Sequence, residues 1–317
     1  MRPWSALILT THAVFRVSIT DLDTDRTALI YDNFGPTPRL WTTLCDGSEW
    51  DRYKSDVAAT IENMTTSKLG QLVEDAQTLF MDAISHKIVL VRREDLANTR
   101  SLHTIGPITP NIEARIQRRL RYLDRLEIVK LYKLFMKNPN SRQMAGMMFE
   151  PIGHRLLEAG ITLYIVPMVR LNNMPKGNSQ WYSTHTDLPT PELEASRQEN
   201  LSNHREPLQV SPTKVVEVGS KPVPIEENVY YFPTKSNIVG IDSYMVSGGR
   251  LYLFQFTVGQ KHEVKPALKK FLDALEGIPA EANWRFVFII PKDILVKCPQ
   301  LKELGTLPMY SAAVDVE

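Results

Sequence analysis

Residues 241–262 read I-D-S-Y-M-V-S-G-G-R-L-Y-L-F-Q-F-T-V-G-Q-K-H, and this stretch decides the fold of the second half of the chain. Two runs rich in apolar and aromatic residues flank the pair Gly248-Gly249, a pattern typical of a tight hairpin turn. We therefore expect strands over 238–246 and 250–258, joined as a hairpin.

Three polar side chains on this hairpin form the first candidate site. Because strand side chains alternate between faces, Gln255 and Thr257 point to the same side, and the hairpin folds them back beside Asp242. An acid with polar neighbours at this place suits a metal site in a phosphodiester-cleaving enzyme. The same residues also fit a half-exposed hairpin without chemistry, in which Gln255 satisfies a buried backbone group.

The flanking segments predict helices and further strands around the hairpin. Helical apolar spacing runs over 110–137 and again over 141–159, where Pro151 predicts a kink or an interruption. An apolar stretch at 161–170 predicts a strand. After the hairpin, we expect a helix at 265–276 and a strand at 284–290.

These elements predict an α/β protein with a mixed sheet and three consecutive parts. We expect a small α/β and helical part at 1–105 and a basic connecting helix within 106–140. The third part, 141–317, has the order helix, strand, strand, strand, helix, strand. Within it, the polar and proline-rich residues 171–235 are typical of a long surface insertion.

Composition narrows the class of protein. The chain has 317 residues, 43% of them hydrophobic and 23% charged, with a formal net charge of +1, as in ordinary globular proteins. Cys45 and Cys298 are its two cysteines, which favours an intracellular protein of the nucleus or cytoplasm without structural zinc. No apolar run approaches the roughly 20 residues that cross a membrane.

The order of elements, with four short motifs, resembles the PD-(D/E)XK nuclease superfamily. The motifs are S-R-Q-M-A-G-M-M-F-E at 141–150, I-D-S-Y at 241–244, L-F-Q-F-T-V-G-Q-K-H at 253–262 and W-R-F-V-F-I-I-P at 284–291. More narrowly, the chain resembles the nuclease-like C-terminal domain of Crinkler and retrotransposon-hot-spot proteins, which are frequent in fungi and oomycetes. The resemblance covers about 141–291 and implies a restriction-endonuclease-like core.

The resemblance also implies a divalent-cation site, with Mg²⁺ or Mn²⁺ as cofactor. Asp242 takes the position of the acid on the second strand, and Glu150 that of the assisting glutamate on the first helix. Gln255 stands where the superfamily has a second acid, so the cation would receive a neutral carbonyl oxygen in place of a carboxylate. Glu150 directly precedes Pro151, so it also fits a solvated position at a kink.

The remaining implied site residues concern the positive charge that phosphodiester hydrolysis requires. Thr257 stands where lysine is usual, so the motif reads Q-x-T in place of (D/E)-x-K. Lys261 lies a few residues further on and could replace the missing cation, and His262 could transfer a proton near neutral pH.

Nucleic acid is the partner that both the resemblance and the basic helix favour. Arg115, Arg118 and Arg119 lie on the basic helix and could contact phosphates. The same charges also fit a solvated helix face with Glu/Arg pairs.

Two functions therefore stay open. One is a metal-dependent nuclease, and the other is a catalytically degenerate nuclease fold that binds nucleic acid or a protein. Crinkler-type proteins often carry an upstream ATPase region, but this chain has no Walker A sequence. A protein partner that supplies ATPase function is therefore a further possibility.

Overall fold

The computed structural model describes residues 24–35, 40, 44, 49–71, 85–93, 103–171, 180–183, 205–219, 223–233, 240–299 and 307–316. Its helices are α2 (Thr24–Phe34), α4 (Trp50–Glu62), α6 (Ser85–Ile88), α7 (Pro110–Leu120), α8 (Arg125–Lys137), α9 (Arg142–Glu158) and α11 (Ala267–Asp273). Two short 3₁₀ turns lie at Pro139–Ser141 and Glu281–Asn283. Together with the strands below, these helices confirm a mixed α/β fold.

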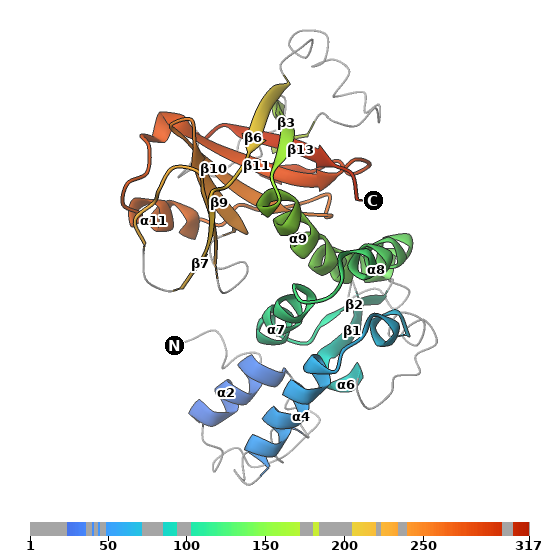
Figure 1. Cartoon of the computed structure of the whole chain (residues 1–317). Helices are drawn as coiled ribbons and strands as arrows, with labels where there is room; N and C mark the ends of the chain where they lie inside the picture. Colours follow the sequence, from blue (N-terminus) through green and yellow to red (C-terminus); the bar gives the residue numbers. More distant parts are fainter. Residues whose placement is uncertain are drawn as a thin grey trace.

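An eight-stranded mixed sheet dominates the second half of the chain (Figure 1). Across the sheet, the strands are β6 (Glu206–Val210), β3 (Ile161–Pro167), β13 (Met309–Val314), β11 (Trp284–Pro291), β10 (Arg250–Phe256), β9 (Ser243–Ser247), β8 (Val229–Pro233) and β7 (Lys214–Val218). The pairs β10–β11, β11–β13 and β7–β8 are parallel, and the other pairs are antiparallel.

Two smaller sheets complete the described strands. The first consists of β1 (Val89–Arg93) and β2 (His103–Pro107), and the second of β12 (Lys297–Pro299), β5 (Gln180–Tyr182) and β4 (Val169–Leu171). The small α/β character expected for the first hundred residues is therefore present in α2, α4, α6, β1 and β2.

The hairpin at the centre of the sheet is confirmed. Strands β9 and β10 pair in antiparallel register, with Leu253 opposite Tyr244. Gly248 and Gly249 both have positive φ, at 58° and 69°, which is the backbone of the two-residue turn that glycine permits. Because Gly-Gly fixes this turn, it also fixes which residues of β9 and β10 face each other.

The two faces of the sheet are covered by different helices. On β10, Phe254 and Phe256 belong to the apolar cluster that contains α9, whereas Leu251 and Leu253 belong to the cluster that contains α11. The cluster on the α9 side continues without a break into α7, α8 and the helices of the first part of the chain. Helix α9 therefore connects the large sheet to that first part.

The predictions for two helices have different outcomes. The helix expected at 141–159 is confirmed as α9, which continues uninterrupted through Pro151 and is followed by Gly160 with φ of 85°. The prediction of a single basic helix over 110–137 is wrong, because the chain forms α7 and α8 with a turn between them. Asp124 ends the turn, since its side chain accepts hydrogen bonds from the N–H groups of Leu126 and Glu127 at 2.8 and 3.4 Å.

The strands differ from the expected order in two ways. The strand at 161–170 is β3 followed by β4, and β3 is separated from β10 by β11 and β13 instead of neighbouring the hairpin. The stretch 171–235 is also not a simple insertion, because β6, β7 and β8 form both edges of the large sheet and the strand next to β9. These strands join the sheet through main-chain hydrogen bonds. A polar side-chain composition does not prevent main-chain hydrogen bonding.

Candidate functional site

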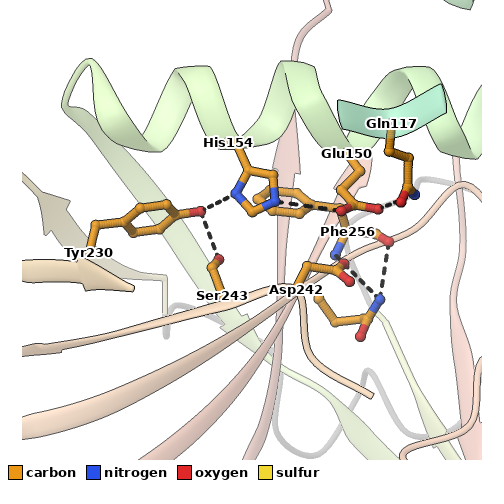
Figure 2. A network of polar contacts seen from close by, with 8 residues as sticks. Gln117, Glu150, His154, Tyr230, Asp242, Ser243 and Phe256 are labelled. Carbon is orange, nitrogen blue, oxygen red and sulfur yellow. Dashed lines mark hydrogen bonds and ion pairs between the residues drawn. The ribbon is translucent and has the colours of Figure 1, made fainter. Parts of the chain in front are cut away.

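Asp242 is a buried carboxylate at the start of β9. Its backbone N–H donates to the carbonyl oxygen of Phe254 at 2.9 Å, which holds it against β10. Its Oδ2 accepts two hydrogen bonds of 2.7 Å, from Nε2 of Gln255 and from the backbone N–H of Phe256 (Figure 2). Only 3% of Asp242 is exposed. The expectation that the hairpin brings Gln255 beside Asp242 is therefore confirmed.

Glu150 contributes a second carboxylate from α9, on the helix that crosses above this end of the sheet (Figure 2). Its Oε2 accepts a hydrogen bond of 2.7 Å from Nε2 of Gln117 on α7. Its Oε1 lies 3.7 Å from Nε2 of His154, one helical turn further along α9. The Glu150 side chain is 12% exposed, so both carboxylates lie largely away from water.

Burial raises the pKa of the Asp242 carboxyl well above its ordinary value, and the negative charge of Glu150 raises it further. The hydrogen bonds from Phe256 and Gln255 lower that pKa, and the positive charge of Lys265 lowers it least. The two carboxylates are thus close enough to repel each other. A cation between them would remove that repulsion.

A chain of buried polar groups extends from Glu150 across the face of the sheet (Figure 2). Nδ1 of His154 lies 2.7 Å from the hydroxyl oxygen of Tyr230, which donates to Oγ of Ser243 at 2.7 Å. Burial raises the pKa of Tyr230 well above its ordinary value, so the hydroxyl keeps its proton. The hydrogen bond between Tyr230 and His154 takes its direction from the tautomer of the ring, since either Nδ1–H or the hydroxyl group can donate. This arrangement leaves Nε2 facing Glu150.

Two amide oxygens near the carboxylates are buried without hydrogen bonds. Gln255 and Gln117 each donate Nε2 to a carboxylate, and within the described part of the chain their Oε1 atoms have no hydrogen-bond partner. Unsatisfied buried oxygens are rare and often mark an ion or water position. Two carboxylates with neutral carbonyl oxygens are the hard ligands that Mg²⁺ and Mn²⁺ accept, so these residues fit such a cation. Among the described residues no three His, Cys, Asp or Glu side chains form a metal group, so the amides are needed.

The other three predicted site residues lie after β10. Oγ1 of Thr257 accepts a hydrogen bond of 3.0 Å from the N–H of Gly259 and so stabilises the turn that follows the strand. Lys261 is exposed. The ring of His262 packs edge-on against Phe288, with 5.6 Å between ring centroids, and burial lowers its pKa. Within the described part of the chain, these three residues contact the turn after β10 and strands β11 and β12, and none of these contacts involves Asp242.

Lys265 is a site residue that the sequence reasoning missed. Its positive charge reaches Asp242 and also lowers the pKa of His262. A Cβ atom on Gly240 would lie 3.0 Å from the backbone N of Lys265, so the segment before β9 and the segment before α11 are in contact. The signal was available, because Lys265 begins the expected helix directly after the hairpin that carries Asp242.

His154 was also missed, although it lies four residues after Glu150 on the same helix. Positions i and i+4 share one helix face, so the pair could have been predicted. The partners Tyr230 and Ser243 had no such local signal.

The predicted nucleic-acid contacts on α7 differ in exposure. Arg118 is exposed, whereas Arg115 and Arg119 are half-buried. Burial lowers the pKa of Arg115, and the charge of Glu62 on α4 opposes that shift. Arg115 therefore faces the first part of the chain, and Arg118 is the best placed of the three to meet a ligand.

Comparisons with known proteins add no relative. No protein-family model matches the chain, and neither the curated proteins nor the solved structures contain a match. In the described part of the chain, no helix combines the length and apolar character that a membrane crossing requires.

Proposed function

We propose that this chain acts on or binds nucleic acid through a nuclease-like domain, and that Asp242, Glu150 and Gln255 hold a divalent cation, Mg²⁺ or Mn²⁺. One observation carries the proposal. Two carboxylates from separate segments meet in a buried place, where they are held by amide and backbone N–H donors and repel each other. Such pairs are expensive unless a cation or a shared proton stabilises them.

The order of elements supports the nuclease-like assignment. Strands β8, β9 and β10 form an antiparallel meander, α11 follows, and β11 then pairs in parallel with β10. Helix α9 covers one face of this unit. Taken with α9, these elements support the helix, three-strand, helix, strand order that the resemblance implies, with β8 in the place expected for the strand at 161–170 and with β3 to β7 lying between α9 and β8 in the chain.

The residues divide the chemistry among them. Asp242 and Glu150 supply charged oxygen ligands, and Gln255 supplies its Oε1 atom while its Nε2 orients the Asp242 carboxylate. A cation held there would supply charge stabilisation for a phosphodiester and would help to activate water as the nucleophile. Lys265 provides the positive charge that Thr257 lacks. Gln117 holds the Glu150 carboxylate in place by a hydrogen bond, and Nε2 of His154 lies beside it.

The experiment that tests this proposal combines cation binding with cleavage. The purified chain is titrated with Mn²⁺ by calorimetry, and is incubated with end-labelled single- and double-stranded DNA and RNA in Mg²⁺, Mn²⁺ or EDTA. Asp242→Asn keeps the shape of the side chain and removes its charge. Glu217→Gln, at an exposed position on β7, removes one charge elsewhere on the same sheet.

We expect Mn²⁺ binding and metal-dependent cutting by the parent chain and by Glu217→Gln, and neither by Asp242→Asn. A parent chain that binds no Mn²⁺ contradicts the cation site.

A second function is favoured by how completely Asp242 is already satisfied. Its Oδ2 accepts two N–H groups, and Thr257 stabilises a turn instead of approaching the carboxylate. A nuclease fold in this state would bind nucleic acid or a protein partner, such as one supplying ATPase function, without hydrolysis. Nucleic-acid binding that is equally strong in Mg²⁺ and in EDTA, and equally strong in the Asp242→Asn variant, would support this second function.

A further inference from the structure

Tyr122 is an exposed aromatic residue in the turn between α7 and α8. It is 77% exposed, which is the highest fraction among the exposed large hydrophobic residues of the described chain. Leu126, in the first turn of α8, is 64% exposed. Exposed apolar side chains are candidates for an interaction surface where other features at the same place point to one.

The turn that carries Tyr122 is fixed from below. Nη2 of Arg155 on α9 donates to the carbonyl oxygens of Arg121 and Leu123, at 2.5 and 2.6 Å. These are the two residues on either side of Tyr122. The N–H of Tyr122 itself donates to the carbonyl oxygen of Arg119 at 3.0 Å. The backbone is therefore held on both sides of a side chain that packs on little else, and binding would cost little further ordering.

Arginine residues flank Tyr122 along the chain. Arg118 and Arg125 are exposed on the adjoining ends of α7 and α8. Arg121 places its guanidinium 4.4 Å from the centroid of the Phe232 ring, which fixes a third positive group beside the turn. The nearest acid along the chain, Asp124, accepts hydrogen bonds from α8 as its N-cap. The turn and the adjoining helix ends thus combine an exposed ring with the arginines at 118, 121 and 125, against the two acids Asp124 and Glu127.

We propose that Tyr122, Arg118 and Arg125 form a stacking platform for single-stranded nucleic acid, with a base on the tyrosine ring and phosphates on the arginines. The inference rests on the proposed function and names the form of nucleic acid that the chain takes. A base must be unstacked to lie on an aromatic side chain, and duplexes keep their bases stacked. Charge complementarity with phosphate selects nucleic acid over a neutral or basic protein.

The platform is mechanically linked to the candidate site. Helix α7 carries both Arg118 and Gln117, and Gln117 donates to Glu150. Helix α9 carries both Glu150 and Arg155, and Arg155 fixes the turn. A strand that stacks on Tyr122 is therefore held by the same two helices that position the second carboxylate.

The test measures fluorescence anisotropy of labelled single-stranded and duplex DNA and RNA of one sequence, in EDTA so that no cleavage occurs. The variants are Tyr122→Ala, Tyr122→Phe and Arg118→Gln. Tyr164→Ala is the matched control, because Tyr164 is 59% exposed on β3 and has no part in the platform. Circular dichroism verifies that each variant keeps the parent fold.

We expect Tyr122→Ala to weaken single-strand binding about 5- to 150-fold, the range for one stacked base, while Tyr122→Phe and Tyr164→Ala bind like the parent. Arg118→Gln is expected to reduce the slope of log affinity against log salt by about 1. Single-strand binding that is unchanged in Tyr122→Ala, or a parent chain that prefers duplex, overturns the platform and leaves the proposed function standing. A parent chain that binds and cuts no nucleic acid overturns both.

Discussion

Of the two glycines in α9, Gly153 packs more closely on the sheet, and adding one methyl group there tests the packing that places Glu150. A Cβ atom on Gly153 would lie 2.2 and 2.3 Å from two carbon atoms of the Phe256 ring. Carbon atoms in contact normally lie about 3.5–4.0 Å apart, so the ring or the helix must move. The Phe256 ring has little freedom, because it packs against His154 and Phe149 at centroid distances of 4.9 and 6.3 Å.

Gly146 provides a control in the same helix. A Cβ atom there would lie 3.5 Å from Cγ2 of Val258, which is an ordinary contact. Replacing a helical glycine by alanine stabilises by about 1 kcal/mol at either position. Overpacking at Gly153 costs about 3 kcal/mol, at the upper end of the usual range. We therefore expect Gly153→Ala to lose about 2 kcal/mol and Gly146→Ala to gain about 1 kcal/mol.

Thermal unfolding followed by circular dichroism measures this difference. At about 2–4 °C per kcal/mol, the Tm values of the two variants should differ by about 6–12 °C, with Gly153→Ala the lower. Exchanging Phe256 for leucine in the Gly153→Ala background should restore part of the loss. A Gly153→Ala chain that melts at or above Gly146→Ala would refute the close packing of α9 on β10.

Three further outcomes are expected. Tyr230→Phe removes the hydroxyl group between two buried polar partners and should lower the free energy of unfolding by about 1–3 kcal/mol in denaturant. The control Tyr231→Phe removes a hydroxyl group that is only partly buried and should lower it less. Equal losses would contradict the buried hydrogen-bond network of His154, Tyr230 and Ser243. Because burial lowers the pKa of His262, the unfolded chain binds more protons at this residue as the pH drops through about 6.5. The parent should therefore lose more stability over this range than His262→Leu does, and equal pH slopes for the two chains would refute the reasoning. Burial raises the pKa of Cys298 to about 11, so in a Cys45→Ser background the native thiol should resist a disulfide reagent at pH 8 and react only after denaturation.

Local signals in the sequence predicted the local parts of the fold. The pair Gly248-Gly249 favours a two-residue turn with positive φ, and the apolar runs on either side of it are long enough for two paired strands. The strands β9 and β10 were therefore predictable. Alternation along β10 likewise placed Gln255 beside Asp242. The break between α7 and α8 was predictable too, because Asp124 and Glu127 have the spacing of a capping box, but the apolar periodicity continued across it.

Long-range pairing explains what the sequence did not reveal. Strands β6 and β7 are short and polar, and nothing in them indicates that they pair with β3 and β8. The contact between His154 and Tyr230 joins residues 76 positions apart, so neither residue carries a local sign of the other. Burial of Asp242 follows from α9 crossing the sheet end, which depends on the whole core and not on the hairpin.

The position of β13 has a consequence for biosynthesis. This strand comes last among the described strands, yet it lies inside the sheet, between β11 and β3. While the ribosome is still making residues 292–308, β3 and β6 can pair with each other but cannot join the hairpin half. Both halves then present an unpaired edge, which is the surface from which sheets aggregate. Chaperone binding to nascent chains should therefore persist until β13 has emerged, and deleting 309–314 should leave an insoluble product.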